Sequence, residues 1–429
     1  MTNLSRVPSN LHIGFVSTRF AGTDGVSLEA EKWATTLELM GHTCFYFAGE
    51  ADTPPEQSRV VPEAFFGHPE INAVQQVAFA SRMRPPEVSR RVSQLKEYLK
   101  DELYAFVKDF EIDLLLVENA LTIPMNIPLG MALTQFIVET CFPTIAHHHD
   151  FFWERKRFLT NCVWDYLNMS FPPNLPSIRH VVINSSGRHQ LGLRTGLSSI
   201  LIPNVMDFDN PPPPPDDYTN DLRKDLGIGP NEKFILQPTR VVQRKGIEHA
   251  IELLHSLEID ARLVISHASG DERDAYEQRV RDFADMMGVS TAFVADIIHP
   301  ERGRTDDGRK IYTLGDTYQK ADLVTYPSTI EGFGNAFLEA IYYRKPIVVN
   351  SYSIFSIDIK PKGFQIIEFD GYITQDTVQQ VCYLLEHPTL AEQMAETNYL
   401  FAKRYYSYGV LERGLQTLIV DLFGVDPIT

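Results

Sequence analysis

Cysteine is scarce in this chain, and the few cysteines are not paired in the sequence. Four occur in 429 residues, without a CxxC spacing, at Cys44, Cys141, Cys162 and Cys382. This pattern argues against a disulfide framework and against a zinc ribbon, and it fits a reducing compartment. The opening residues lack an apolar core after a basic start, so we predict no signal peptide and a cytoplasmic location.

Long apolar runs and positive charge are lacking as well. No run of about 18 apolar residues occurs, so no transmembrane helix is predicted. The 39 basic residues are outnumbered by 56 acidic residues, which gives a formal net charge of −17. This balance argues against a broad nucleic-acid surface and against strong attraction to anionic lipid, but it allows a local basic pocket.

The first half of the sequence has the pattern of a parallel α/β sheet. Residues 11–17 form an apolar run typical of a buried strand, residues 26–41 have helical periodicity, and residues 43–49 have the pattern of a second strand. A glycine-containing loop joins the first strand to the helix. This βαβ unit is typical of the start of a Rossmann-like sheet. Further strands are predicted at 113–119, 143–149 and 180–186.

The same pattern restarts after a proline-rich break. Five consecutive prolines, Pro211 to Pro215, cannot continue a helix or a central strand, so they indicate a linker. We predict an α/β protein of two Rossmann-like domains that face each other across a deep cleft. The predicted parts are an N-terminal domain (1–205), a linker (206–232), a C-terminal domain (233–405, with strands at 233–239 and 261–267 around a helix at 247–257) and a helix (406–429) that packs back on the N-terminal domain.

The segment "EGFGNAFLE" (331–339) has the composition of a phosphate-binding turn. Gly332 and Gly334 would let the backbone approach a ligand closely, and the following helix would offer free N–H groups to a diphosphate. Glu339, inside this helix, would reach ribose hydroxyls, whereas Glu331 would face a sugar. The alternative is a surface turn before a core helix, because the segment lacks the third glycine of the dinucleotide fingerprint.

Two cations in "TRVVQRKG" (239–246) lie where parallel sheets bind their ligands. Arg240 ends a predicted strand and Lys245 begins the next helix, and ligands of such sheets bind at the carboxyl ends of the strands. Together the two cations would neutralise a departing diphosphate. The alternative is a solvated basic loop, which the second phosphate-suited element downstream disfavours.

Three consecutive histidines, His147 to His149, end another predicted strand. Alternate residues of a strand face opposite ways, so His147 and His149 share one side and His148 lies on the other. Three adjacent residues therefore do not form one compact metal face, and we predict no metal site. We interpret His147 and His148 as hydrogen-bonded core residues. His149, at the strand's carboxyl end, is assigned to the active site, with Asp150 fixing the loop.

A basic cluster follows in this otherwise acidic chain. Arg155 and Arg157 lie close in sequence to His149. One hypothesis is that they bind, with Asp150, an acceptor that carries a carboxylate or a phosphate, which arginine matches with paired hydrogen bonds. The alternative is a solvated helix face. The "DFD" segment at 207–209 is interpreted as structural rather than as metal-binding.

Taken together, these motifs resemble those of the retaining glycosyltransferases of family 4, which have the GT-B fold. The resemblance covers nearly the whole chain and is more specific in its second half. It rests on Glu331 and Glu339 with seven residues between them, on Arg240 and Lys245, on "IPNVMD" (202–207), and on "YQKADLVTYPS" (318–328).

The resemblance implies a role for each matching residue. Arg240 and Lys245 would hold the diphosphate of a nucleotide-sugar donor, Glu339 its ribose, and Glu331 the hydroxyls of the donor sugar. His149 takes the place of the family's active-site histidine. The further positions implied are Gly25, Gly332, Phe333, Gly334 and Asn335 for the donor, and Asp24 for the acceptor.

The predicted activity is transfer of a hexose, of glucose or mannose type, from a UDP- or GDP-linked donor to a small soluble acceptor. The resemblance implies retention by front-face attack, which requires neither a metal nor a cofactor. Two alternatives stay open: a retaining disaccharide phosphorylase on the same fold, and a catalytically silent nucleotide-sugar-binding protein. The nucleotide base is open because residues 267–272 and 299–310 depart from the family's pattern, and the oligomeric state is open too.

Overall fold

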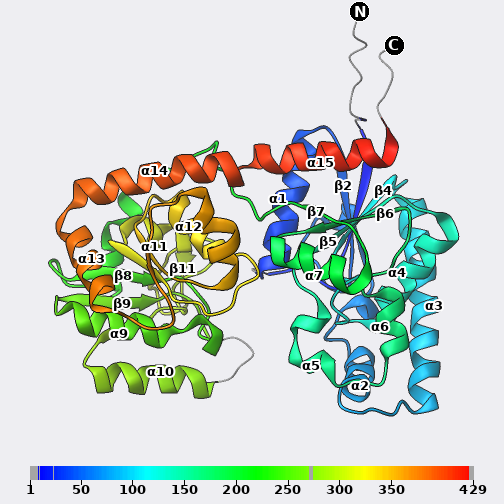
Figure 1. Cartoon of the computed structure of the whole chain (residues 1–429), viewed down its shortest axis with the longest axis horizontal. Coiled ribbons are helices and arrows are strands. Elements are labelled where there is room, and N and C mark those ends of the chain that lie inside the picture. Colours follow the sequence, from blue (N-terminus) through cyan, green and yellow to red (C-terminus); the bar gives the residue numbers. More distant parts are fainter. Residues whose placement is uncertain (1–7, 9, 23, 270–273, 425–429) are drawn as a thin grey trace, which may run out of the picture. The chain divides into compact units, whose positions relative to one another are not determined.

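The computed structural model describes residue 8 and residues 10–22, 24–269 and 274–424. The chain divides into two compact units (Figure 1). Unit 1 consists of Met1–Val205 together with Tyr408–Thr429, and unit 2 consists of Met206–Ser407. Within the described residues, no helix combines the length and the apolarity that crossing a bilayer requires.

Unit 1 is built on one fully parallel sheet of seven strands. Their order is β3-β2-β1-β4-β5-β6-β7. The first six follow the order of dinucleotide-binding sheets, so the direction of the winding reverses between β1 and β4. The strands are β1 (His12–Val16), β2 (Thr43–Ala48), β3 (Ser58–Val60), β4 (Leu114–Glu118), β5 (Thr144–His148), β6 (Ile178–Val182) and β7 (Ile200–Leu201).

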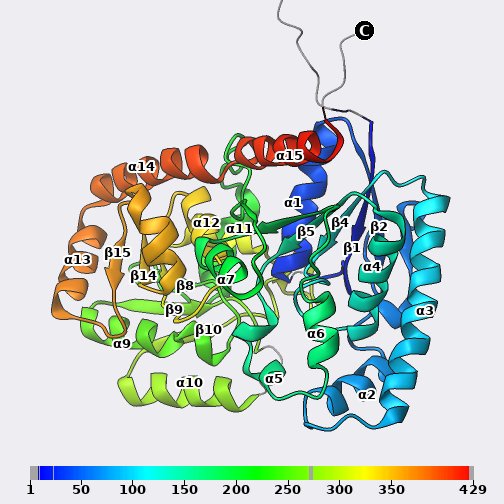
Figure 2. The same cartoon turned by 45° about the vertical axis from the view of Figure 1, so that its right-hand side comes forward.

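Helices cover both faces of this sheet because its strands are apolar on both sides (Figure 2). One face packs on α1 and α15, and the other packs on α3 and α4. The helices of unit 1 are α1 (Gly25–Leu39), α2 (Pro69–Ala78), α3 (Pro86–Asp109), α4 (Ile127–Thr140), α5 (Lys156–Leu159), α6 (Trp164–Ser170), α7 (Ser185–Thr195) and α15 (Tyr408–Phe423).

Unit 2 repeats the architecture with a six-stranded parallel sheet. Its order is β10-β9-β8-β13-β14-β15, so the winding reverses between β8 and β13. The strands are β8 (Lys233–Gln237), β9 (Ala261–Ile265), β10 (Ser290–Phe293), β13 (Leu323–Tyr326), β14 (Ile347–Asn350) and β15 (Ile367–Phe369). The helices are α8 (Leu222–Asp225), α9 (Ile247–Leu257), α10 (Asp274–Met287), α11 (Leu314–Lys320), α12 (Asn335–Tyr342), α13 (Gln375–Glu386) and α14 (Pro388–Tyr406).

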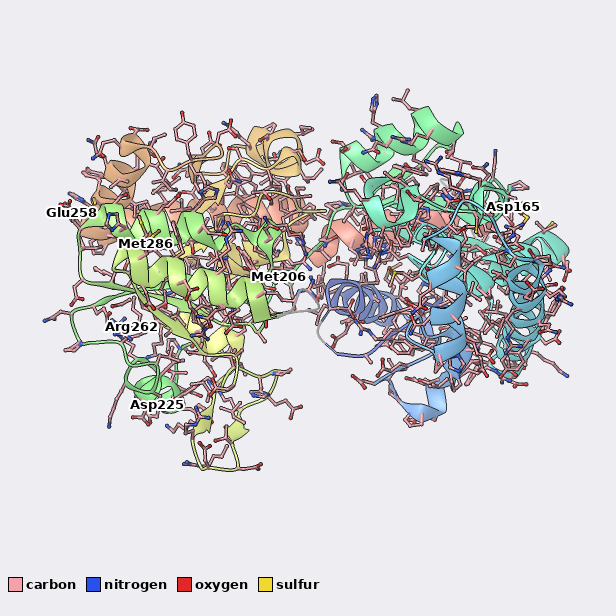
Figure 3. The ribbon with its side chains drawn as sticks, turned by 90° about the horizontal axis from the view of Figure 1, so that it is seen from below. Asp165, Met206, Asp225, Glu258, Arg262 and Met286 are labelled. Carbon is pink, nitrogen blue, oxygen red and sulfur yellow. The ribbon has the colours of Figure 1, made fainter. Side chains whose placement is uncertain are left out.

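The segment predicted as a linker, 206–232, belongs to unit 2. Met206, labelled in Figure 3, is the first residue of that unit. The proline run forms neither helix nor strand, but Leu222 and Ile228 further along are buried. The Tyr218 hydroxyl is within hydrogen-bond distance of two backbone carbonyls of the hairpin formed by β11 (Gly303–Arg304) and β12 (Lys310–Ile311), at 2.9 and 2.8 Å. Residues 299–310 therefore contain a structured hairpin.

The helical C-terminal region is broken, which corrects the single helix predicted to begin at 406. α14 ends at Tyr406, Ser407 is extended, and α15 begins at Tyr408. Ser407 leaves the helical conformation where it pairs in parallel with Met206 as an isolated bridge. The Met206 amide also donates to the Tyr406 carbonyl at 2.9 Å. The strand-like contact with the start of unit 2 thus ends the first helix.

His148 is buried, as the alternation predicted, and it faces a second buried histidine. His148 Nε2 lies 2.9 Å from His180 Nδ1 of the neighbouring strand β6. Burial lowers the pKa of His148, and it lowers the pKa of His180 to about 4. The pair is therefore neutral in the folded protein at neutral pH.

Unit 1 is expected to lose stability as the pH falls from about 6.5 towards 4. Over this range His180 takes up a proton in the unfolded chain but stays unprotonated in the folded chain. The free energy of unfolding is therefore expected to fall by about 3 kcal/mol from this histidine alone. His180→Gln should flatten the dependence of the unfolding free energy on pH. All three tryptophans (33, 153 and 164) lie in unit 1, so fluorescence in urea measures its unfolding. Equal pH slopes for the variant and the wild type would contradict the prediction.

Candidate active site

The two ligand-suited segments of unit 2 lie at the point where its sheet reverses direction. The loop after β8 holds Arg240 and ends in a short 3-10 helix, Gln243–Lys245. The loop after β13 leads through Glu331 into α12. Because β8 and β13 are neighbouring parallel strands, both loops leave the same edge of the sheet. Open α/β sheets bind their ligands at this edge, beside the reversal.

Lys245 and Glu331 form a buried ion pair at this edge. The Lys245 ammonium contacts one oxygen of Glu331, and Arg244 contacts the other at 3.0 Å. The Lys245 and Glu331 side chains are 11% and 9% exposed. Burial lowers the pKa of Lys245, which the charge of Glu331 only partly offsets. Burial would raise the pKa of Glu331, but the charges of Lys245 and Arg244 outweigh it and lower that pKa.

The surroundings of Lys245 are electropositive. Arg240 is exposed at the end of β8. His267, after the neighbouring strand β9, has its pKa lowered to about 4 by burial and then by the charges of Lys245 and Arg240. A histidine that stays neutral beside two cations indicates a field suited to an anion. Sequence reasoning did not single out His267 or Arg244. The segment 267–272, which departs from the family's pattern, is described only up to residue 269, because residues 270–273 lie outside the described residues.

The glycine turn before α12 requires glycine at one position. Gly334 has φ +123°, and a Cβ there would lie 2.4 Å from the Tyr352 hydroxyl oxygen. That hydroxyl donates to the Phe333 carbonyl at 2.8 Å. The turn is therefore held against a buried tyrosine and brings the backbone to the amino end of α12.

Gly334→Ala is expected to lower the free energy of unfolding of unit 2 by about 2 kcal/mol, because alanine is strained at this φ and meets Tyr352. Gly371→Ala is the matched control, since its φ is +74° and nothing lies within 4 Å of its added Cβ. Calorimetry of both variants should show the larger loss for Gly334. A smaller loss at Gly334 than at Gly371 would contradict the steric argument.

Glu339 lies on the first turns of α12, beside a buried tyrosine. The Tyr318 hydroxyl donates to its carboxylate at 2.9 Å. Burial and the charge of Glu339 raise the pKa of Tyr318, so the tyrosine stays a donor. This bond orients the carboxylate, which is suited to accept from the paired hydroxyls of a ribose. The ribose-binding role itself stays a prediction.

In unit 1 the structure joins His149 to a residue that sequence reasoning did not single out. Glu118 ends β4, and its carboxylate is fully buried. It lies 3.0 Å from His147 Nδ1 and 3.0 Å from His149 Nε2. The signal in the sequence was a charged residue at the end of an apolar strand. The position opposite Glu118 on β5 is His147, so the parallel register brings them together.

These three side chains have the types and the spacing of a metal-ligand set, with ligand atoms within 4.8 Å of one another. A ligating histidine normally donates its other ring N–H to an acceptor. His147 Nε2 is buried and has no hydrogen-bond partner among the described residues, and its ring stacks on Trp33. A neutral His147 that donates its Nδ1–H to Glu118 carries no hydrogen at Nε2, so the buried Nε2 needs no acceptor. If Nδ1 bound a metal instead, Nε2 would carry the hydrogen and would lack an acceptor within the described part of the chain. We therefore interpret the cluster as a hydrogen-bonded carboxylate, and the absence of a metal stays a prediction.

The loop after His149 is held by its own charges. Asn119 accepts from the His149 amide at 2.9 Å, and its side-chain amide lies 3.4 Å from Asp150. Asp150 forms an ion pair with Arg155. The guanidinium of Arg157 lies over the Phe158 ring. In this arrangement Asp150 and Arg155 neutralise each other, so binding an acceptor through them would require that pair to open.

The loop after β1 is also occupied by local contacts. Asp24 caps α1 by accepting from the Val26 and Ser27 amides, and it pairs with Arg19 at 2.9 Å. Gly25 is the exposed first residue of the helix. Thr23 lies outside the described residues. The structure thus gives Asp24 a capping role, and its acceptor role stays a prediction.

Comparison with known proteins shows the family to which the chain belongs. It is 30% identical over 436 aligned residues to the mannosylglucosylglycerate synthase of Thermotoga maritima. The alignment covers 94% of this chain and 98% of that protein. It is 31% identical to the enzyme of the same name from Petrotoga mobilis, over 83% of this chain and 86% of that protein. Residues 310–401 match the family model described as glycosyl transferases group 1. The chain belongs to this glycosyltransferase family.

The fold agrees with this assignment. HepE of Anabaena, solved in complex with UDP and glucose, superposes with a TM-score of 0.66 at 15% identity, covering 96% of this chain and all of that one. The predicted GT-B fold class of this glycosyltransferase is therefore confirmed, as is its resemblance to GT-B glycosyltransferases. The matched family segment contains α12 and both motif glutamates.

Proposed function

We propose that this glycosyltransferase moves a mannosyl group from a nucleoside-diphosphate donor to glucosylglycerate, with retention of the anomeric configuration. The observation that carries the proposal is similarity along almost the whole length to two proteins named mannosylglucosylglycerate synthase. Glucosylglycerate bears a carboxylate, which agrees with the acceptor chemistry suggested by the basic residues after His149. The predicted donor sugar was a hexose of glucose or mannose type, and of these two we expect mannose to be transferred.

The donor site proposed is the sheet edge of unit 2. Lys245 and Arg240 would bind the diphosphate, Glu339 the ribose, and Glu331 the sugar hydroxyls. The electropositive surroundings of Lys245 and the buried state of the ion pair support this assignment. When the diphosphate arrives, it would take over as the partner of Lys245, so one carboxylate oxygen of Glu331 would become free to accept from a sugar hydroxyl.

The mechanism proposed is front-face attack. The acceptor hydroxyl would enter on the side from which the diphosphate leaves, and a phosphate oxygen would take its proton. The protein's contribution would be to position the reactants and to stabilise the negative charge of the leaving group. Lys245 and Arg240 would supply that stabilisation without a metal. The resemblance gives His149 a hydrogen bond to the donor sugar.

The experiment is a screen of donors against acceptors, with the product configuration determined by NMR. GDP-mannose, UDP-glucose and ADP-glucose are each offered with glucosylglycerate, with its phosphorylated form and with glucosylglycerol, which lacks the carboxylate. Turnover with glucosylglycerate and an α-linked product from an α-linked donor are expected. Turnover that is equal with glucosylglycerol would refute the anionic acceptor.

The same assay separates the alternatives. Phosphate-dependent cleavage of a disaccharide without a nucleotide would favour a phosphorylase. Tight nucleotide-sugar binding, measured by thermal shift, without turnover of any donor would favour a silent binding protein. Activity that survives exhaustive chelation would support the metal-free mechanism, and activity restored only by a divalent cation would refute it.

A further inference from the structure

The carboxylate of Glu118 has no part in the donor chemistry proposed above, yet it is fully buried in unit 1. A buried carboxylate is costly unless it is paired and hydrogen-bonded. Glu118 meets that requirement through two imidazoles. His147 lies on strand β5, and His149 directly follows the carboxyl end of that strand. Each ring offers one N–H, so both bonds form with the histidines in their neutral states. His147 thereby stabilises the carboxylate in place, and His149 is the partner nearer to solvent, at 11% side-chain exposure.

His149 is held at two points by the end of β4. Its ring nitrogen Nε2 lies 3.0 Å from Glu118, and its backbone amide donates to the Asn119 side chain at 2.9 Å. Asn119 has φ +59°, a left-handed conformation that non-glycine residues adopt uncommonly. The backbone bend at Asn119 therefore lets consecutive residues hold both the ring and the backbone of His149. With Nε2 directed at Glu118, the nitrogen on the other side of the ring is Nδ1.

We propose that Glu118 is the positioning residue of His149, accepting its Nε2–H so that Nδ1 is the nitrogen presented to the donor sugar. The proposal rests on the function proposed above in one respect, that His149 contacts the sugar. It adds a residue and an atom: Glu118 acts through the histidine, and Nδ1 is the atom that exchanges a hydrogen bond with a sugar hydroxyl. A ring held in this way does not turn to offer Nε2.

The charged groups around His149 come from three elements. Glu118 lies on β4, Glu29 on α1, and Asp150 follows His149 in the chain; Glu29 is paired with Lys32, and Asp150 with Arg155. Burial would lower the pKa of His149, but Glu118 outweighs it and raises that pKa, with smaller contributions from Glu29 and Asp150. His147, the other ring on the carboxylate, has its pKa lowered by burial. Removing the charge of Glu118 should therefore lower the pKa of His149.

The first test determines the tautomer directly. Protein labelled with ¹⁵N-histidine is observed by NMR through the pH titration of each ring, and His149→Gln identifies the signal of His149. The expected neutral form carries its proton on Nε2. A neutral form that carries its proton on Nδ1 would overturn the proposal. This measurement requires no substrate, so it gives an answer even if the screen of donors and acceptors finds no activity.

The second test is kinetic. Glu118→Gln keeps the size of the side chain but removes its charge and offers an amide N–H that favours the wrong tautomer. The kcat is expected to fall about 10- to 100-fold, the loss typical when a partner that orients a metal-bound histidine is removed, because Glu118 would orient His149 in the same way. The limb of the pH–rate profile that belongs to His149 should move to lower pH. An unchanged limb with reduced kcat would mean a merely structural role and would overturn the proposal.

His180→Gln is the matched control. It alters another buried residue of the same sheet, bonded to His148 on the opposite side of β5. It should lower stability without moving the limb of the pH–rate profile. Metal analysis of the purified wild type and of Glu118→Gln completes the design. One tightly bound divalent ion per chain that the variant loses would mean that Glu118 and the two histidines are its ligands, and that result would also overturn the proposal.

Discussion

Replacing Lys245 with methionine is expected to lower kcat/KM for the nucleotide-sugar donor on the order of 10²- to 10³-fold, the cost typical of removing one group that stabilises transition-state charge. Methionine matches the length of lysine and keeps the buried site filled. The charge lost is the one nearest Glu331, at the sheet edge where the diphosphate is proposed to leave. Glu331 retains Arg244 as a partner at 3.0 Å, so the variant should fold.

The matched control is Lys345→Met. Lys345 is a second lysine of unit 2 whose pKa is lowered by burial, and it donates to the Gln319 carbonyl at 2.8 Å. Steady-state kinetics at several donor concentrations should show a large loss for Lys245 and little change for Lys345. A similar loss in both would indicate that any buried lysine is needed for folding. An active Lys245 variant would remove the residue from the donor site.

Replacing Leu415 and Leu418 of α15 together with alanine is expected to destabilise unit 1 by roughly 5 kcal/mol. Each leucine is fully buried in the core that α1 shares with the sheet, and burying such a side chain typically contributes about 2 to 5 kcal/mol. The two losses will not add fully, because the residues are adjacent on one helix face. The free energy of unfolding of a typical domain is of the same order, so unit 1 should be marginal.

Tryptophan fluorescence in urea measures this loss selectively, because all three tryptophans lie in unit 1. The control replaces Glu412 and Thr417, two exposed residues of the same helix, with alanine. That variant should unfold at nearly the wild-type urea concentration. Wild-type stability in the leucine variant would mean that α15 is not part of the unit 1 core in solution.

The sequence predicted the sheets well because parallel strands buried on both faces are continuous apolar runs. The predicted strand at 233–239 is β8 at 233–237, and the predicted helix at 247–257 is α9 with the same bounds. The strand predicted at 180–186 is less accurate, since β6 covers 178–182. There β6 ends at Val182, but the apolar run continues through Ile183 to Asn184, which caps α7. The hydrophobic pattern therefore does not mark the residue at which the strand ends.

The candidate site was harder to predict, because the contact between Glu118 and His149 depends on which strands are neighbours in the sheet. Glu118 and His149 are 31 residues apart, and only the pairing of β4 with β5 brings them together. Arg244 was passed over beside Lys245, since sequence alone does not tell which of two adjacent cations is buried. The break at Ser407 follows from its bridge to Met206, a contact between residues about half the chain apart.

Unit 1 is assembled from two stretches of chain separated by the whole of unit 2. The ribosome therefore completes residues 206–407 before it makes α15, whose leucines close the apolar face of α1. Unit 2 is continuous and has all of its strands at that stage, whereas the sheet face of unit 1 that packs on α1 still lacks its second helix, α15. Synthesis thus imposes an order in which the second unit matures first, and the apolar surface beside α1 is exposed to premature association until α15 covers it.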